Sequence, residues 1–109
     1  MTKDETLKLA AKAAGLRFAI NGDDLPGYVA VAGDGWTHWN PLTDDGDALR
    51  LAVKLNIDFY LGNDDGAATF AGYFIGTVQK FAIVQHGIDP YAATRRAIVR
   101  AAAELGIQS

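Results

Sequence analysis

Apolar residues recur at helical spacing in two stretches of the first half of the chain. The first is Lys3–Ala14, where Thr2 and Glu5 form a capping box at the start of the repeat. The second is Asp45–Leu55, whose apolar positions repeat every three or four residues and end at Asn56. Asparagine tolerates the left-handed backbone that often closes a helix, so the sequence predicts two helices with these bounds.

A third helix is predicted near the C-terminus. Asp89 can cap it and Pro90 suits its first turn. Gly106 is expected to lie just beyond its end, because glycine commonly stops helices. Arg100 and Glu104 stand four residues apart and are expected to form an exposed ion pair on this helix.

Between the helices, short β-branched or aromatic runs are separated by glycine and aspartate, which is typical of strands joined in hairpins. The pattern of the last run does not decide which of its side chains face the core. The candidates are Val78, Phe81 and either Ile83 or Val84. The predicted strands are Arg17–Ile20, Tyr28–Ala32, Trp36–Trp39, Ile57–Leu61, Ala67–Phe74 and Thr77–Gln85.

This order of elements predicts one α+β domain over residues 1–109. We expect an α-β-α layered sandwich in which three helices pack on an antiparallel or mixed sheet of about five strands. A dinucleotide-binding arrangement is disfavoured, because no strand leads through a Gly-x-Gly-x-x-Gly turn into a helix.

Composition narrows the classes of function. The formal net charge of −3 disfavours non-specific nucleic-acid binding. The absence of cysteine excludes disulfides and thiolate metal sites. The acidic start of the chain lacks the pattern of a signal peptide, and no apolar run reaches the roughly 20 residues of a membrane span. We therefore expect a cytoplasmic protein without membrane contact.

The residues best suited to recognition lie on the predicted strand Trp36–Trp39 and in the segment that leads from it to the second predicted helix. Two tryptophans flank a histidine there, and a run of carboxylates follows. At least one tryptophan is expected to be partly exposed, since neighbouring positions of a strand point to opposite faces. The candidate binding residues are Trp36, His38, Trp39, Asn40, Asp44 and Asp45. A secondary interface is expected at Arg95, Arg96 and Arg100 on the last helix.

No motif in the sequence points to catalysis, a metal or a cofactor. The acidic run lacks the ligand spacing of a calcium-binding loop and is better explained by helix capping. His38 and His86 form no recognisable pair, and neither a zinc-protease motif nor a nucleophile elbow occurs. We therefore expect a protein without catalytic residues.

The stretches Trp39–Leu55 and Ala92–Ala103 resemble small phage and prophage proteins of the ABA-sandwich type. The resemblance covers the second and third helices and implies the layered fold and a viral or prophage origin. It implies no defined activity.

These observations favour a non-catalytic phage accessory protein that binds a host or phage protein in the host cytoplasm through the Trp36–Asp47 segment. A homodimer formed through the alanine-rich last helix is a secondary expectation. The alternative is a binder of a nucleotide-like ligand, stacked on Trp36 or Trp39 and read by Asn40 or Asp44. A third class is a small enzyme with His38 as general base.

Overall fold

The structure is a computed structural model and describes residues 2–20, 28–31, 37–62 and 67–108. Within these residues the order of elements is α1 (Lys3–Ala13), β1 (Arg17–Ile20), β2 (Tyr28–Val31), β3 (Thr37–His38), α2 (Asp45–Leu55), β4 (Asp58–Gly62), β5 (Ala68–Ile75), β6 (Val78–Gln85) and α3 (Pro90–Gln108). Each predicted element is present, with bounds that differ by a few residues at most.

The predicted cap at Thr2 and the predicted end at Asn56 are present, and Asp44 caps α2. The Thr2 side chain accepts a hydrogen bond from the Glu5 amide, and the Asp44 side chain accepts one from the Asp47 amide. Asn56 closes α2 with a left-handed backbone, at a φ of 56°. These short-range bonds satisfy helix-terminal groups that otherwise lack partners, which explains why the helices begin and end where they do.

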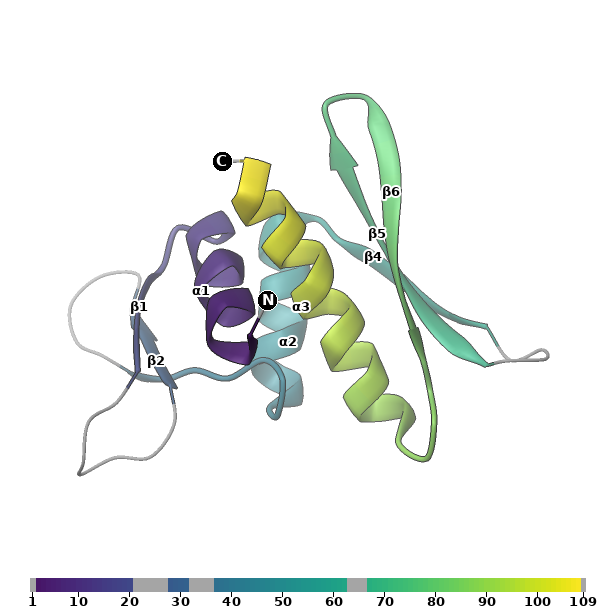
Figure 1. The fold of residues 1–109 in the computed structure, drawn as a ribbon, viewed down its shortest axis with the longest axis horizontal. Coiled ribbons are helices and arrows are strands. Elements are labelled where there is room, and N and C mark those ends of the chain that lie inside the picture. Colours follow the sequence, from purple (N-terminus) through teal and green to yellow (C-terminus); the bar gives the residue numbers. More distant parts are fainter. Residues whose placement is uncertain (1, 21–27, 32–36, 63–66, 109) are drawn as a thin grey trace.

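The strands form two separate antiparallel sheets in the described part of the chain, in the orders β1-β2-β3 and β4-β5-β6. The α+β class is therefore confirmed, whereas the expected single sheet of about five strands is not found. The helices lie between the two sheets (Figure 1), so the layers do not follow the expected α-β-α order. Helix α3 packs on β5 and β6, and α1 packs on β1.

Helix α3 continues through Gly106 to Gln108, so the prediction that Gly106 stops the helix is wrong. Gly106 is buried against α1, and a Cβ atom at this position would lie 2.7 Å from the carbonyl carbon of Leu9. The glycine therefore allows two helix backbones to approach closely. Its small size serves helix packing rather than helix termination.

The alanine-rich face of α3 forms the centre of the core. The fully buried alanines of α3 pack with Leu7 and the alanines of α1, while Ala71 and Tyr73 close the core from the sheet. The chain's own elements therefore cover most alanines of α3, so a homodimer through this helix would have to use its exposed side chains.

Candidate functional site

The segment predicted for binding is mostly engaged within the fold. Trp39 is buried, with 8% of its surface exposed, and its ring meets Phe18 edge to face at 5.9 Å between centroids. His38 is exposed at the end of β3. Trp36 lies outside the described residues. The ring of Trp39 therefore serves the core and is not presented for stacking on a ligand.

The polar residues of the same segment hold the entry to α2. Asn40 donates its backbone N–H to Asp47 Oδ2 at 3.0 Å, and its side-chain oxygen accepts from the Leu42 amide at 3.0 Å. Asp44 caps α2, as described above. Asp45 pairs with Arg95 at 2.6 Å, and Arg95 also donates to the Leu42 carbonyl at 2.9 Å. These bonds fasten α2 to α3.

A buried polar cluster joins β5, the end of β6 and α3. The fully buried Thr69 hydroxyl lies 2.9 Å from His86 Nε2 and 2.8 Å from the Thr94 hydroxyl, which donates to the Pro90 carbonyl. Every member has a hydrogen-bond partner, and Thr69 has no exposed surface on which to meet a substrate. We interpret the cluster as a structural link between the sheet and α3.

A group of exposed apolar side chains lies on the sheet β4-β5-β6. Alternate residues of a strand point to opposite faces, and the Thr69–Thr94 bond shows that the odd-numbered residues of β5 point toward α3. The even-numbered residues and their partners point away from the helices. The apolar side chains on that side, which we call the open face, are Tyr60, Phe70, Phe74, Phe81 and Ile83.

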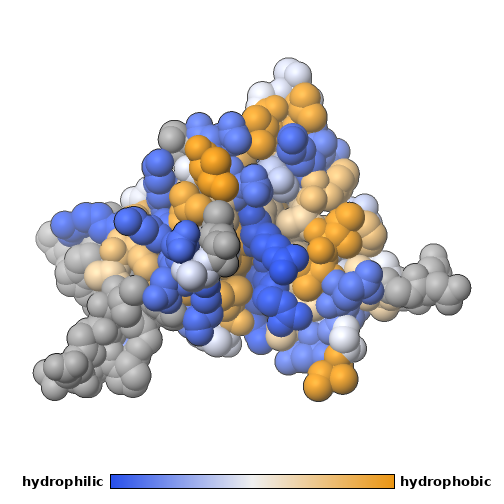
Figure 2. Space-filling view, in the orientation of Figure 1, coloured by the Kyte–Doolittle hydropathy of each residue, from blue (hydrophilic) through white to orange (hydrophobic). Residues whose placement is uncertain are grey.

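The open face is an aromatic cluster in contact with solvent. Tyr60 stacks on Phe70 at 5.0 Å between ring centroids and meets Phe81 edge to face at 6.4 Å. Between 44% and 52% of Tyr60, Phe74, Phe81 and Ile83 is exposed. No described element covers this side of the sheet in Figure 1, and Figure 2 shows apolar side chains gathered on the sheet half of the molecule.

Two glycines let the aromatic rings lie flat on the sheet. A Cβ atom on Gly72 would lie 3.2 Å from the ring of Phe81, and one on Gly62 would lie 3.2 Å from the ring of Phe70. Both rings therefore cover backbone that would otherwise be exposed, an arrangement that stabilises glycine in strands. The cluster is therefore formed by contacts within the chain itself, before any partner binds.

A hollow of about 640 Å³ lies on the other side of β6. Its walls are β6 at Phe81–Ile83, Tyr73 of β5, the outer side of α3 and the start of α1. We call it the β6 groove. Arg96 and Arg100 line it, and burial together with the nearby carboxylate of Glu104 raises the pKa of the Tyr73 hydroxyl. The groove thus combines apolar walls with two guanidinium groups.

The expected ion pair between Arg100 and Glu104 is not formed. Arg50 pairs with Asp47, and Arg95 pairs with Asp45. Arg96 and Arg100 have no carboxylate partner in that part of the chain. Of the three arginines predicted as a secondary interface, Arg95 is therefore used inside the fold, whereas the other two are available at the surface.

Sequence reasoning did not single out the open face. Val84 is the core residue of β6, and Phe81 and Ile83 point to the open side. The alternation of Phe81 and Ile83 indicates that these two side chains share one side of the sheet. It does not indicate which side the helices cover, because β5 is apolar at nearly every position. The outward direction became clear only from the packing of α3.

Among the described residues, no group of three or more metal-ligating side chains occurs. None of their helices combines the length and apolar character needed to cross a membrane. No protein-family model, curated protein or solved structure matches this chain. The resemblance to phage proteins therefore stays a prediction.

Proposed function

We propose that the chain is a non-catalytic binding protein whose open face contacts an apolar surface of another protein. The observation that carries the proposal is the pre-formed cluster of Tyr60, Phe70 and Phe81 on a side of the sheet that no described element covers. Contiguous exposed apolar surface is uncommon on monomeric proteins and marks interaction sites. Aromatic residues supply much of the binding energy at such sites.

The charges around the open face favour a protein over a nucleic acid. The polar residues on this side of the described sheet are Asp58, Gln79 and Gln85. Aromatic sheets that bind single-stranded nucleic acid also need cations that contact the phosphates. With a carboxylate and no lysine or arginine among the described residues on this side, the open face suits an apolar surface of a protein rather than a phosphate backbone.

A role as a phage accessory protein is compatible with this function and forms part of the proposal. The contact surface, however, shifts from the Trp36–Asp47 segment that the sequence favours to the sheet. The reason is that Trp39, Asn40 and Asp45 are engaged in packing, hydrogen bonding and an ion pair inside the fold. His38 keeps an exposed side chain.

The test uses the immobilised protein to capture partners from an extract of the source cells. The open-face variant carries Tyr60→Ser and Phe81→Ser, and the matched control carries Leu49→Ser and Val53→Ser, which remove exposed apolar side chains from α2. Circular dichroism verifies that both variants fold. A captured protein is then purified and its Kd is measured by calorimetry.

We expect the open-face variant to bind the purified partner at least about 30-fold more weakly than wild type, since a central aromatic contact is worth about 2 kcal/mol or more. The control variant is expected to bind as wild type does. Equal binding by both variants, or no protein retained above background, would show that the open face is not a binding surface.

A further inference from the structure

The edge of β6 next to the β6 groove is open for pairing with another strand. In the described sheet β6 pairs with β5 alone, and the His86 amide bonds to the Ala67 carbonyl at 3.0 Å. In an antiparallel pair, alternate residues bond to the neighbouring strand. Since His86 bonds to Ala67, the even-numbered residues of β6 bond to β5, and the backbone N–H and C=O groups of Phe81 and Ile83 point to the free edge. Such an edge is a template for an extended chain.

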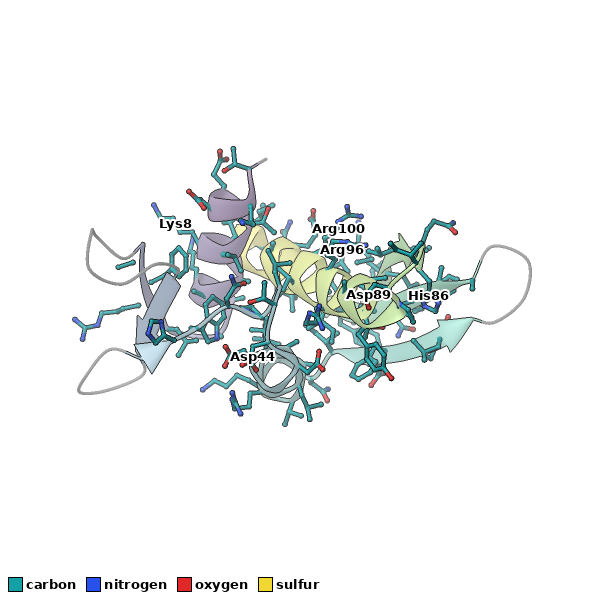
Figure 3. The ribbon with its side chains drawn as sticks, turned by 90° about the horizontal axis from the view of Figure 1, so that it is seen from below. Lys8, Asp44, His86, Asp89, Arg96 and Arg100 are labelled. Carbon is teal, nitrogen blue, oxygen red and sulfur yellow. The ribbon has the colours of Figure 1, made fainter. Side chains whose placement is uncertain are left out.

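The charges in the groove favour acidic side chains on a chain that pairs with this edge. Arg96 and Arg100 lie side by side on one face of α3, away from Asp44 (Figure 3). Both are exposed, and neither has a carboxylate partner among the described residues. Among the described residues that line the groove, Glu104 is the one acidic side chain, against the two arginines and Lys3. Guanidinium groups bind carboxylates through paired hydrogen bonds, so acidic side chains complement this wall.

The spacing of the arginines agrees with an extended partner. Residues four apart on a helix are separated by about 6 Å along its axis. Residues two apart on a strand point to the same face and are separated by about 6.6 Å. Acidic residues at alternate positions of a strand beside β6 therefore match Arg96 and Arg100, while the positions between them lie beside Phe81 and Ile83 on the open face.

The other edge of the sheet lacks this complementarity. A hollow of about 300 Å³ borders β4 and is lined by Phe59, Leu61 and Arg95. The guanidinium of Arg95 is already paired with Asp45 there. An acidic strand at β4 thus finds no available arginine in the described residues.

A second copy of the chain does not suit the β6 edge either. Its own β6 has the sequence VQKFAIVQ, which contains a lysine and no acidic residue. Pairing two β6 edges would place the arginines and Lys80 of both copies close together, and like charges across an interface disfavour association. A charged residue on an edge strand is a common device against such pairing.

From these observations we infer that the β6 edge and groove bind an extended peptide segment with acidic side chains at alternate positions, which adds as a fourth strand to the sheet. The inference rests on the proposed protein-binding function and names the class of partner segment. Main-chain hydrogen bonds to Phe81 and Ile83 supply affinity, and the arginines select the sequence. Apolar residues at the alternating outward positions extend the open face.

The test uses a designed probe, the capped peptide Thr-Val-Glu-Val-Glu-Val-Thr with a fluorescent label, titrated with the full-length protein by anisotropy. The matched control peptide has glutamine in place of both glutamates. The groove variant carries Arg96→Gln and Arg100→Gln, and the control variant carries Lys8→Gln and Lys54→Gln, which remove the same charge elsewhere. Two further peptides are N-methylated either at the valines or at the glutamates.

We expect saturable binding of the acidic peptide to wild type and to the control variant. The groove variant is expected to bind at least about tenfold more weakly, which is the usual effect of losing a hydrogen bond between charged groups. One N-methylation pattern is expected to abolish binding and the other to leave it nearly unchanged, because only alternate amides of an added strand face β6.

The inference is overturned if no binding occurs at millimolar protein, if the groove and control variants bind equally, or if both N-methylated peptides bind as the parent does. It is also overturned if free succinate competes as well as the peptide, because the arginines then bind a small anion without strand addition. A dimer of the chain that protects the Phe81 and Ile83 amides from hydrogen exchange contradicts it as well. Any of these results leaves the open-face capture experiment to decide the proposed function by itself.

Discussion

Replacing Gly106 by alanine tests the packing of α1 on α3, on which the rest of the fold is built. Alanine is the better helix former and on propensity alone would stabilise α3 by about 0.5–1 kcal/mol. In the structure, however, the new Cβ atom overlaps the backbone of Leu9, with 2.7 Å to its carbonyl carbon and 3.1 Å to its Cα. No side-chain rotation relieves a clash with backbone, so the two helices must move apart.

The magnitude follows from what that movement disturbs. Overpacking a core costs about 1–3 kcal/mol, and the upper part of the range applies because backbone must shift. The shift also loosens contacts of Leu7, Ala10 and Ala11, which are fully buried at the α1–α3 interface. Subtracting the propensity gain leaves a net loss of about 2 kcal/mol, which corresponds to a decrease in Tm of about 10 °C for a domain of this size.

The assay is urea unfolding followed by circular dichroism, with thermal unfolding as a second measure. The control is Gly46→Ala in the first turn of α2, where the nearest atoms to a new Cβ belong to the side chains of Asp44 and Arg50, at 3.1–3.2 Å. These side chains can adjust, so we expect the control to change stability by less than about 1 kcal/mol. If Gly106→Ala is as stable as wild type, the close approach of α1 and α3 is wrong.

Three further results are expected. Burial and the carboxylate of Glu104 raise the pKa of Tyr73 above the ordinary tyrosine value of 10.0. The unfolded chain therefore loses this proton first, and the free energy of unfolding should fall as pH rises beyond about 10. Tyr73→Phe should show a shallower fall in urea unfolding, and an unchanged slope would refute the assignment. Thr69→Val removes both hydrogen bonds of this buried hydroxyl, to His86 and to Thr94, and should cost about 1–3 kcal/mol in the same assay, whereas a neutral effect would mean that the cluster is not structural. In a Trp36→Phe variant the fluorescence of Trp39 should be blue-shifted and resistant to iodide, and a red, quenchable emission would contradict its burial.

Local signals in the sequence predicted the helices well. The caps at Thr2, Asp44 and Asn56 depend on bonds within a few residues, so they can be read without knowledge of the fold. The prediction for Gly106 is wrong because the local sequence does not distinguish a glycine that ends a helix from one that lets a neighbouring helix approach closely. Only the position of Leu9 across the interface distinguishes them.

The division into two sheets was beyond the reach of the sequence pattern. Hairpin partners were identified, because β4–β5 and β5–β6 join neighbouring segments. Whether β1-β2-β3 and β4-β5-β6 share one sheet depends on pairing between distant segments, which leaves no local trace. The expectation of a single layered sandwich failed at this point.

The candidate site shows the same limit. Tryptophans and clustered acids attract attention in a sequence, but Trp39 fills the core and Asp44 caps a helix. The open face consists of ordinary aromatic and aliphatic residues, and it differs from core only in that nothing described covers it. Arg96 and Arg100 were predicted as a secondary interface, and their position in the β6 groove gives that prediction a specific form that remains to be tested.

Site-specific photo-crosslinking tests the central claim, that the open face is where this protein meets its partner, most directly. A benzophenone amino acid is placed at Phe81 on the open face and, in a separate protein, at Val53 on α2, both exposed in the structure. After irradiation in the source cells, we predict one defined crosslinked protein from position 81 and none from position 53. A defined crosslinked protein from position 53, without any from position 81, would contradict the account and move the contact surface to α2.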